Sequence, residues 1–474
     1  MGPSTADSGF VPILPNPYIV GYPVRDPAMF FGRETEFELV RKRFKNADHG
    51  SLVVFCGERR SGKTSILLQI QQGRLGGEFI PVLIDMQAMV VENERDFFAR
   101  TTHQMVAQLH DQRIADAVPD YSPGQASIQF RGFIETLLRL HPGRKPLFLV
   151  DEYELIEEMV DSGTLNSDMS FIVANLMENS PLFVIFTGSH PLSERRKDYW
   201  RFLEKAHEYR RIGYLHRSDA QRLIRDPVDG RVTYADDTEQ RILRLAAGHP
   251  FYTQAICQNL VDALNDECTN RVMGPHLDAV VAQMVDSPFP QMIFRWQSLP
   301  REHKLTLALL AQVLQSSEVV ATASQLLETL EEGGYGLSLA LPTVSTALET
   351  LFGQELLSKD DAPTPGYNFR MDLWRLWVRR MHSVWQVMGE EAATTLAGGL
   401  IARGDVPARI FVDEEPVGSG ELPSSGRRSV APGSHVVEVV FRGGTRDRMT
   451  VAVAPNETVE IRWANKKLLV PPGR

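Results

Sequence analysis

Two glycines, a lysine and a threonine lie near residue 60 at a spacing that can bind phosphate. Gly57, Gly62, Lys63 and Thr64 match the pattern G-x-x-x-x-G-K-[ST], directly after the apolar run of residues 52–56. Glycines let the backbone approach an anion closely, and the N–H groups at the start of a following helix point toward that anion. The spacing therefore predicts a nucleotide-binding loop between a buried strand and a helix. An ordinary glycine-rich turn is the alternative.

Each side chain of this loop has an expected role. Lys63 would bridge the terminal phosphates of a nucleoside triphosphate, and the Thr64 hydroxyl would hold Mg²⁺. The loop residues expected to bind the nucleotide are Gly57, Arg60, Ser61, Gly62, Lys63, Thr64 and Ser65. The expected cofactors are ATP or ADP together with Mg²⁺.

A second chemical signal is an apolar run that ends in two carboxylates. Residues 146–150 are followed by Asp151 and Glu152, about ninety residues beyond the loop in a region where strand and helix patterns alternate. Asp151 would bind Mg²⁺ through water, and Glu152 would orient or deprotonate the water that attacks the phosphate. We therefore expect Lys63 and Glu152 to be catalytic, and Thr64 and Asp151 to hold the metal.

A further apolar strand, residues 182–186, ends in Thr187-Gly188-Ser189-His190. Parallel strands bring their C-terminal ends to one crevice, so Gly57, Asp151 and Ser189 should converge. Ser189 would either sense the γ-phosphate or cap a helix. Four arginines near this strand end could neutralise phosphate charge, although solvated surface positions are the default expectation for them: Arg195, Arg196, Arg210 and Arg211.

The segments on either side of these strands supply candidates for contact with the nucleotide base. Residues 1–28 are rich in Pro, Gly and Ser and predict an extended arm, in which Tyr18 and Ile19 could cover an adenine ring or pack as a strand on the domain edge. Residues 229–296 turn helical, with a break at Gly248-His249-Pro250 that predicts a hinge between two helices. His249 is expected to be structural or capping rather than an acid–base catalyst.

Residues 297–388 follow the order of a winged helix. Helices are expected at residues 304–314, 323–330, 341–352 and 373–387, with a strand pair at 355–358 and 367–370. The third helix contains no Lys or Arg, and residues 297–385 carry ten acidic and seven basic side chains. Because reading DNA needs basic phosphate contacts, nucleic acid is an improbable partner for this module.

The last part of the chain changes period. Residues 389–403 are expected to be a linker, and residues 404–470 alternate apolar and polar side chains, which predicts a small antiparallel β-sandwich with a binding or spacing role. The predicted fold class is thus multidomain. It has an α/β core with a parallel sheet at 29–228, a helical lid, a winged helix and a C-terminal antiparallel β-sandwich.

Composition sets the broad class of the protein. The 474 residues are 43% hydrophobic with a net charge of −10, which supports buried cores and gives no reason to expect a membrane surface. The three cysteines have no metal or disulfide spacing, and no apolar run approaches the length of a membrane span. These features, and the absence of a signal pattern, lead us to expect a cytoplasmic protein.

Together, these motifs resemble those of the STAND branch (signal transduction ATPases with numerous domains) of the AAA+-like P-loop NTPases. The motifs that carry the resemblance are Phe31-Gly32-Arg33-Glu34, GERRSGKTS, LFLVDEY, FTGSH and Gly248-His249-Pro250. The resemblance implies that the Pro250 region contacts the base and that the winged helix folds over the nucleotide. It also implies that ADP locks a closed monomer and that ATP favours opening and assembly. At Phe369-Arg370-Met371-Asp372, where relatives carry a His-Asp motif, this chain has no His, and no role is transferred.

The C-terminal module is similar to a PEGA-type domain. The similarity rests on Phe411-Val412-Asp413, Pro416-Val417-Gly418 and residues 431–435, which lead into alternating valines. We expect it to contact a protein or ligand.

Three functions fit these observations. The first is an ATP-binding, slowly hydrolysing STAND-type switch whose nucleotide state controls domain opening, self-assembly or partner binding. The second is a nucleic-acid-associated AAA+-like remodelling or loading ATPase. The third is a scaffold that holds nucleotide without hydrolysing it, which the complete set Lys63, Thr64, Asp151 and Glu152 disfavours.

Overall fold

The computed structural model describes most of the chain and divides it into two compact units. The described residues are 10–45, 47, 49–89, 91–166, 174–175, 177–178, 182–189, 207–361, 364–389, 398–412, 415–416, 422–424, 428–430, 433–441, 445–453, 458–464 and 467–469. The first unit comprises Met1–Ile293 with Arg370–Leu373, and the second comprises Phe294–Phe369 with Trp374–Arg474.

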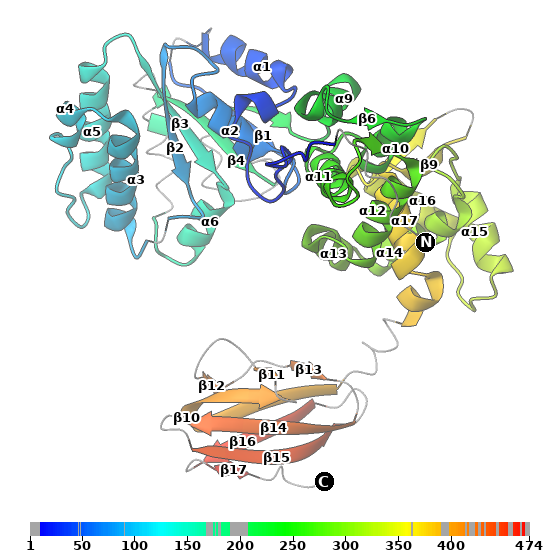
Figure 1. Cartoon of the computed structure of the whole chain (residues 1–474). Helices are drawn as coiled ribbons and strands as arrows, with labels where there is room; N and C mark the ends of the chain where they lie inside the picture. Colours follow the sequence, from blue (N-terminus) through cyan, green and yellow to red (C-terminus); the bar gives the residue numbers. More distant parts are fainter. Residues whose placement is uncertain are drawn as a thin grey trace. The chain divides into compact units, whose positions relative to one another are not determined.

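The first unit is built on a five-stranded parallel sheet with the strand order β2-β3-β4-β1-β5 (Figure 1). Its strands are β1 Leu52–Cys56, β2 Phe79–Asp85, β3 Lys145–Asp151, β4 Phe183–Gly188 and β5 His207–Arg211. Strands β1, β3 and β4 are almost continuously apolar because both faces of the sheet are covered. The predicted α/β core with a parallel sheet is confirmed.

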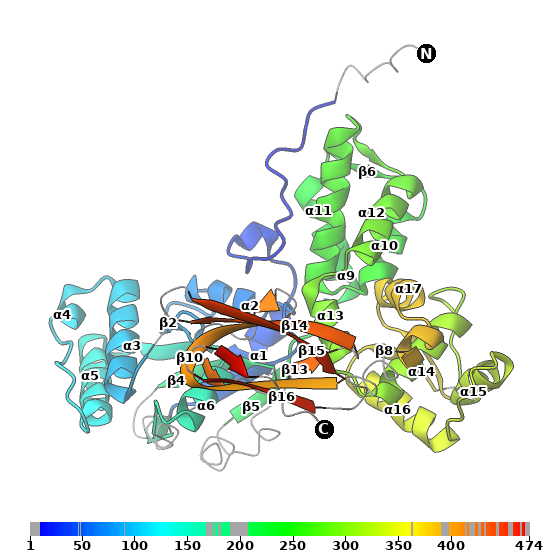
Figure 2. The ribbon, with the colours of Figure 1, turned by 90° about the horizontal axis from the view of Figure 1, so that it is seen from below.

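Helices cover the two faces of this sheet with separate apolar cores. On one face, α1 Glu34–Lys45 and α2 Lys63–Gln71 pack on Val53, Phe55, Leu147 and Leu149. On the other face, α3 Glu94–Leu109 and α5 Ala126–Leu140 pack on the alternate strand residues, such as Leu52 and Phe148, and lie together in both views (Figure 1, Figure 2). The described part of the core also contains two short helices, α4 Gln112–Ala115 and α6 Glu154–Asp161.

A helical lid follows β5 within the same unit. Its helices are α9 Arg217–Arg225, α10 Thr238–Ala246, α11 Pro250–Asp266 and α12 Gly274–Asp286, with the 3₁₀ turn η4 Asp226–Val228 and a short parallel pair, β6 Thr233–Tyr234 and β7 Arg271–Val272. The α10 helix ends where Ala247 and Gly248 adopt positive φ, and α11 starts with Pro250, which fits the first turn of a helix. The predicted break between two helices is therefore present.

The winged-helix order of the second unit is also present. It comprises α14 Arg301–Val313, α15 Ala323–Glu332, α16 Leu341–Gly353, the antiparallel pair β8 Leu357–Asp360 and β9 Gly366–Phe369, and α17 Asp372–Met381. Helix α13, Pro290–Gln297, precedes these elements.

Two boundaries of this module differ from the prediction. The expected strand start at Glu355 is wrong, because Glu355 has a φ of 61° and its N–H bonds to Phe352 O at 2.8 Å, which closes α16. The expected continuous helix at 373–387 is also wrong. Helix α17 ends at Met381, and Ser383 starts a new turn, with its hydroxyl accepting from Gln386 N at 3.3 Å.

The C-terminal module packs its strands around an apolar core that includes Ile410, Val439 and Trp463. The strands are β10 Gly398–Val412, β11 Glu415–Pro416, β12 Leu422–Ser424, β13 Arg428–Val430, β14 Gly433–Phe441, β15 Arg446–Val453, β16 Thr458–Ala464 and β17 Lys467–Leu469. Most neighbours pair antiparallel, as predicted, but β10 and β16 pair parallel. Strand β10 begins within the segment expected to be a linker, and its pairing with β12 is irregular between Arg403 and Ala408. Asp413, Val417, Gly418, Ala431 and Pro432 of the PEGA-like pattern lie outside the described residues.

Among the described residues, no helix combines the length and the apolar character needed to cross a membrane.

Candidate nucleotide-binding site

The glycine-rich segment forms the predicted turn between β1 and α2. Gly57 N donates to Gly188 O at 3.1 Å, and a Cβ on Gly57 would lie 2.1 Å from Ile212 O, so a larger residue cannot fit there. Gly62 has a φ of 99°, which favours glycine, and α2 begins at the next residue. The loop N–H groups and the start of α2 therefore stand where a phosphate would be held.

Lys63 lies at the centre of this loop. Its Nζ donates to Gly57 O at 2.8 Å and to Glu58 O at 2.9 Å, and the residue is buried. Burial lowers the pKa of Lys63, whereas the carboxylates of Glu152 and Asp151 act in the opposite direction. The ammonium group is thus held by the loop itself, next to both acidic residues.

Asp151 is fixed at the end of β3 by two hydroxyl groups. Thr64 Oγ1 donates to Asp151 Oδ2 at 2.7 Å, and the Thr187 hydroxyl donates to Asp151 Oδ1. The described residues contain no cluster of three His, Cys, Asp or Glu side chains that could hold a metal alone. Mg²⁺ prefers oxygen ligands and commonly takes only one or two from the protein, so Thr64 and Asp151 fit this ion.

Glu152 follows directly and faces the cavity described below. It has a φ of 57°, a conformation that costs a non-glycine residue about 1 kcal/mol, and its N–H donates to Thr187 Oγ1 at 3.3 Å. Burial raises the pKa of Glu152, and the charge of Lys63 opposes this rise. Backbone strain and a perturbed carboxylate at one residue are typical of a functional position.

The end of β4 differs in detail from the prediction. Ser189 does not line the cavity, and its hydroxyl donates to Glu154 Oε1 at 2.7 Å, which fixes the first residue of α6. Thr187 is instead the residue of this strand end that reaches Asp151. The sequence predicts a polar end for this strand at residues 187–190, but it does not show which of these side chains contacts Asp151. That depends on the register of β4 against β3.

Of the four arginines predicted near the phosphates, the two that the structure describes, Arg210 and Arg211, do not line the cavity. Arg210 lies 3.7 Å from the Glu36 carboxylate, and Arg211 is not among the lining residues. His190, Arg195 and Arg196 lie outside the described residues.

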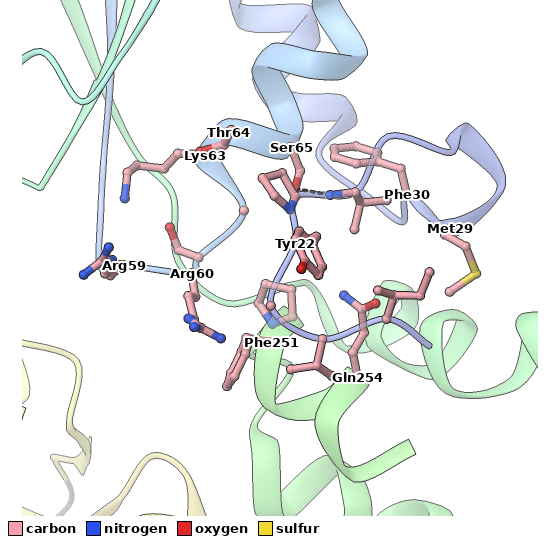
Figure 3. A pocket seen from close by; sticks show the side chains of 18 of the residues that line it. Tyr22, Met29, Phe30, Arg59, Arg60, Lys63, Thr64, Ser65, Phe251 and Gln254 are labelled. Carbon is pink, nitrogen blue, oxygen red and sulfur yellow. Dashed lines mark hydrogen bonds between the residues drawn. The ribbon is translucent and has the colours of Figure 1, made fainter. Parts of the chain in front are cut away.

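A cavity of about 290 Å³ opens beside the loop, within the first unit. Core, arm and lid all contribute to its wall (Figure 3). The core and arm provide Ile19, Val20, Gly21, Tyr22, Pro23, Val24, Met29, Phe30, Phe31, Arg33, Arg59, Arg60, Ser61, Gly62, Lys63, Thr64, Ser65, Gln87 and Glu152. The lid provides Leu215, Leu223, Pro250, Phe251 and Gln254.

The arm contacts this cavity differently from the prediction. Tyr18 does not line it, because its ring is buried and its hydroxyl donates to Ile224 O at 2.6 Å. Ile19 does line the cavity, and so does Tyr22. The Ser65 hydroxyl accepts from Val24 N at 2.9 Å, so this side chain binds the arm.

Two arginines link the loop to the lid. The guanidinium of Arg33 donates to Ser61 O at 3.1 Å and to Gly213 O at 2.5 Å. The guanidinium of Arg60 stacks on the ring of Phe251, with Cζ 4.4 Å from the ring centroid. In the sequence, only the motif Phe31-Gly32-Arg33-Glu34 marks Arg33. No sequence pattern identifies Phe251 as the partner of Arg60.

His249 is buried directly before Pro250 and packs edge-on against Tyr214 and Tyr252. Burial, together with the charges of Arg33 and Arg370, lowers the pKa of His249 to about 3. A neutral, enclosed imidazole is consistent with the predicted structural role.

No family model matches the chain, and no curated protein matches it either. Among solved structures, the ORC2 protein of Aeropyrum pernix (ADPNP-ADP complexes) is 11% identical and has a TM-score of 0.52, covering 80% of this chain and 98% of that one. Cdc6p of Pyrobaculum aerophilum is 13% identical, with a TM-score of 0.40 and coverage of 78% and 99%. The RuvB Holliday junction branch migration motor of Thermotoga maritima is 11% identical, with a TM-score of 0.35 and coverage of 73% and 95%. The parallel sheet, the phosphate loop, the helical lid and the likeness to ORC2 agree: this chain shares the fold of ORC2, a parallel α/β core with a phosphate-binding loop and a helical lid.

Proposed function

We propose that this chain binds ATP with Mg²⁺, hydrolyses it slowly to ADP and phosphate, and uses the bound nucleotide to set the position of the lid. The hydrogen-bonded set of Thr64, Asp151 and Thr187 carries the proposal, because Thr64 lines the same cavity as Lys63 and Glu152 and its hydroxyl binds Asp151. The ORC2 structure, described as ADPNP-ADP complexes, supports adenine nucleotide as the ligand of this fold.

The residues of the site have separate proposed roles. The loop N–H groups bind the phosphates, and Lys63 exchanges its carbonyl acceptors for phosphate oxygens. Thr64 and Asp151 hold Mg²⁺, which neutralises charge on the phosphates when it is bound. Glu152 accepts a hydrogen bond from the attacking water, and its raised pKa strengthens it as a base.

The lid takes part because it forms one wall of the cavity. Pro250, Phe251 and Gln254 come from the start of α11 and face the loop across the cavity. A nucleotide that touches both walls favours the closed lid only through contacts that the open form lacks. In this way, the nucleotide that is bound would determine whether the lid is open or closed.

A finer proposal is the STAND-type switch, in which lid movement controls self-assembly or the binding of a protein partner. It is supported by the Gly248-His249-Pro250 break next to the cavity and by the winged-helix order of the second unit. The C-terminal module, with its PEGA-like pattern, would then contact the protein or ligand that is recognised.

A second candidate is an ATPase that remodels or loads a protein on nucleic acid. It rests on analogy of fold with ORC2, which is a weaker basis than a shared site. The expectation that nucleic acid is an improbable partner rests on two observations: α16 contains no Lys or Arg, and residues 297–385 carry ten acidic and seven basic side chains. Both candidates therefore need a direct test.

The test of the shared proposal compares the wild type with Lys63→Ala and Glu152→Gln. Wild type should bind ADP and turn over ATP slowly, Lys63→Ala should lose nucleotide affinity by about tenfold or more, and Glu152→Gln should retain ATP without hydrolysing it. Calorimetric titration and single-turnover hydrolysis measure these quantities. A wild-type protein that binds no adenine nucleotide would refute the proposal.

A further inference from the structure

Among the described residues, four cationic side chains line the cavity: Arg33, Arg59, Arg60 and Lys63. All four come from the core, because the lid residues in the wall are uncharged. Phosphoryl transfer spreads negative charge over the three equatorial oxygens of the γ-phosphate, and ATPases meet this charge with cations beyond the loop lysine. Within the described wall of the cavity, the cations available for this role therefore all belong to the core.

Two of the three arginines are engaged elsewhere. Arg33 is buried and bound to the carbonyls of Ser61 and Gly213. Arg60 stacks on Phe251 of the lid, on the wall opposite the loop. Moving either guanidinium to a phosphate would remove a contact between core and lid.

Arg59 differs from both of them. It is exposed, and within the part of the chain that the structure describes no hydrogen bond or ion pair holds its guanidinium. In Figure 3 the side chains of Arg59 and Lys63 extend to the same side of the loop, whereas Arg60 turns toward Phe251. Arg59 lines the same cavity as Lys63 and the proposed base Glu152.

We propose that Arg59 is a catalytic arginine supplied within the same chain, which binds the γ-phosphate of ATP as it is transferred to water. Water oxygen forms a bond to the γ-phosphorus while the bond from that phosphorus to the bridging oxygen of ADP breaks. The water proton passes to Glu152 and then to solvent, and the products are ADP and inorganic phosphate. Arg59 stabilises the charge on the equatorial oxygens in the transition state. This inference rests on the proposed ATPase function.

The test uses the full chain and measures binding as well as turnover. Arg59→Ala should leave the ADP affinity within about threefold of wild type, because ADP lacks the group that Arg59 binds. It should lower single-turnover hydrolysis by about 10²- to 10³-fold, as loss of one preorganised charge partner does. It should also lose the extra affinity for ADP–aluminium fluoride over ADP. Arg59→Lys should be intermediate, since it keeps the charge without the planar fork.

Two comparisons make the result specific. Arg60→Ala should change ADP and ADP–aluminium fluoride affinities by similar factors, because its partner is the lid. Arg131→Ala serves as the control, since Arg131 is exposed and, among the residues that the structure describes, pairs with Glu135 on its own helix. If Arg59→Ala hydrolyses ATP at the wild-type rate, or loses ADP affinity as much as rate, the role of Arg59 is refuted while the ATPase proposal stands. If wild type itself does not hydrolyse ATP, both are refuted.

Discussion

Asp151 and Glu152 are neighbours in sequence but have different surroundings. Both oxygens of Asp151 accept hydrogen bonds from hydroxyl groups, which fix the carboxylate in the orientation proposed for holding a metal. Glu152 faces the cavity, and burial raises its pKa, which suits a group that accepts a proton. The end of β3 thus presents two carboxylates with different proposed roles. The left-handed backbone conformation of Glu152 lets the two side chains point in different directions.

His249 gives a prediction about pH at the residue scale. Its folded-state pKa is about 3, whereas an unfolded histidine titrates near 6.5. Between these values only the unfolded state takes up the proton, so the contribution of His249 to stability is complete above about pH 6.5 and is lost as pH falls toward 3.

We therefore expect His249→Gln to flatten the dependence of the free energy of unfolding on pH between pH 4 and 6.5. The change in slope should be at most about 1.4 kcal/mol per pH unit, the value for one proton. Urea unfolding at a series of pH values measures it, and His103→Gln, at an exposed site on α3, is the control. An unchanged slope in His249→Gln would show that the imidazole is not held neutral.

At the element scale, the arm is part of the site rather than a loose extension. Ile13 N donates to Asn265 Oδ1 at 2.8 Å, and Asn265 Nδ2 donates to Ile13 O at 3.2 Å, which ties the arm to α11 (Figure 2). At its other end Val24 N bonds to Ser65, and Gln69 Nε2 donates to Arg25 O at 3.0 Å, both on α2. The arm thus runs from lid to core along the cavity wall.

Removing the lid attachment should loosen this wall. Asn265→Ala removes two hydrogen bonds to the arm, worth about 1–3 kcal/mol together. We expect faster amide exchange in residues 13–24 and a several-fold weaker ADP affinity. Asn259→Ala is the matched control on the same helix, because Asn259 bonds only to Ala255 O. If amide exchange rises while ADP affinity is unchanged, the arm is a structural attachment and not part of the nucleotide site.

The elements of the fold and of the site differ in how well the sequence predicts them. Strand β1, the phosphate loop, the start of α2 and the Asp151–Glu152 pair could be predicted because each depends on residues close together in the chain. Three features of the site depend on contacts between distant segments, which spacing does not reveal. Tyr22 rather than Tyr18 lines the cavity, Thr187 rather than Ser189 binds Asp151, and Arg60 stacks on Phe251. The parallel pairing of β10 with β16 is non-local in the same way, since alternation marks the buried face of a strand but not the direction of its neighbour.

At the scale of the whole molecule, the two candidate functions differ in what the second unit binds. Helix α16 has the position of a reading helix in the winged-helix order, yet it contains no Lys or Arg. Basic side chains of this module lie elsewhere: Arg375 donates to Leu314 O at 3.2 Å, and Lys359 lies 2.9 Å from the Glu349 carboxylate. DNA binding draws most of its affinity from cations on phosphates, so α16 is poorly suited to it.

We accordingly expect duplex DNA to change wild-type ATP turnover by less than about twofold, and ATP to change the mass distribution of Glu152→Gln. Hydrolysis assays at 50 and 200 mM salt, with and without DNA, measure the first effect, and mass photometry with ATP or ADP measures the second. Both salt concentrations are needed because binding through phosphate contacts weakens steeply as salt rises. Lys63→Ala controls for contaminating ATPase and for assembly that does not depend on nucleotide. Stimulation by DNA of tenfold or more at 50 mM salt, with no ATP-dependent assembly, would contradict the switch and favour the second candidate, an ATPase that acts on nucleic acid.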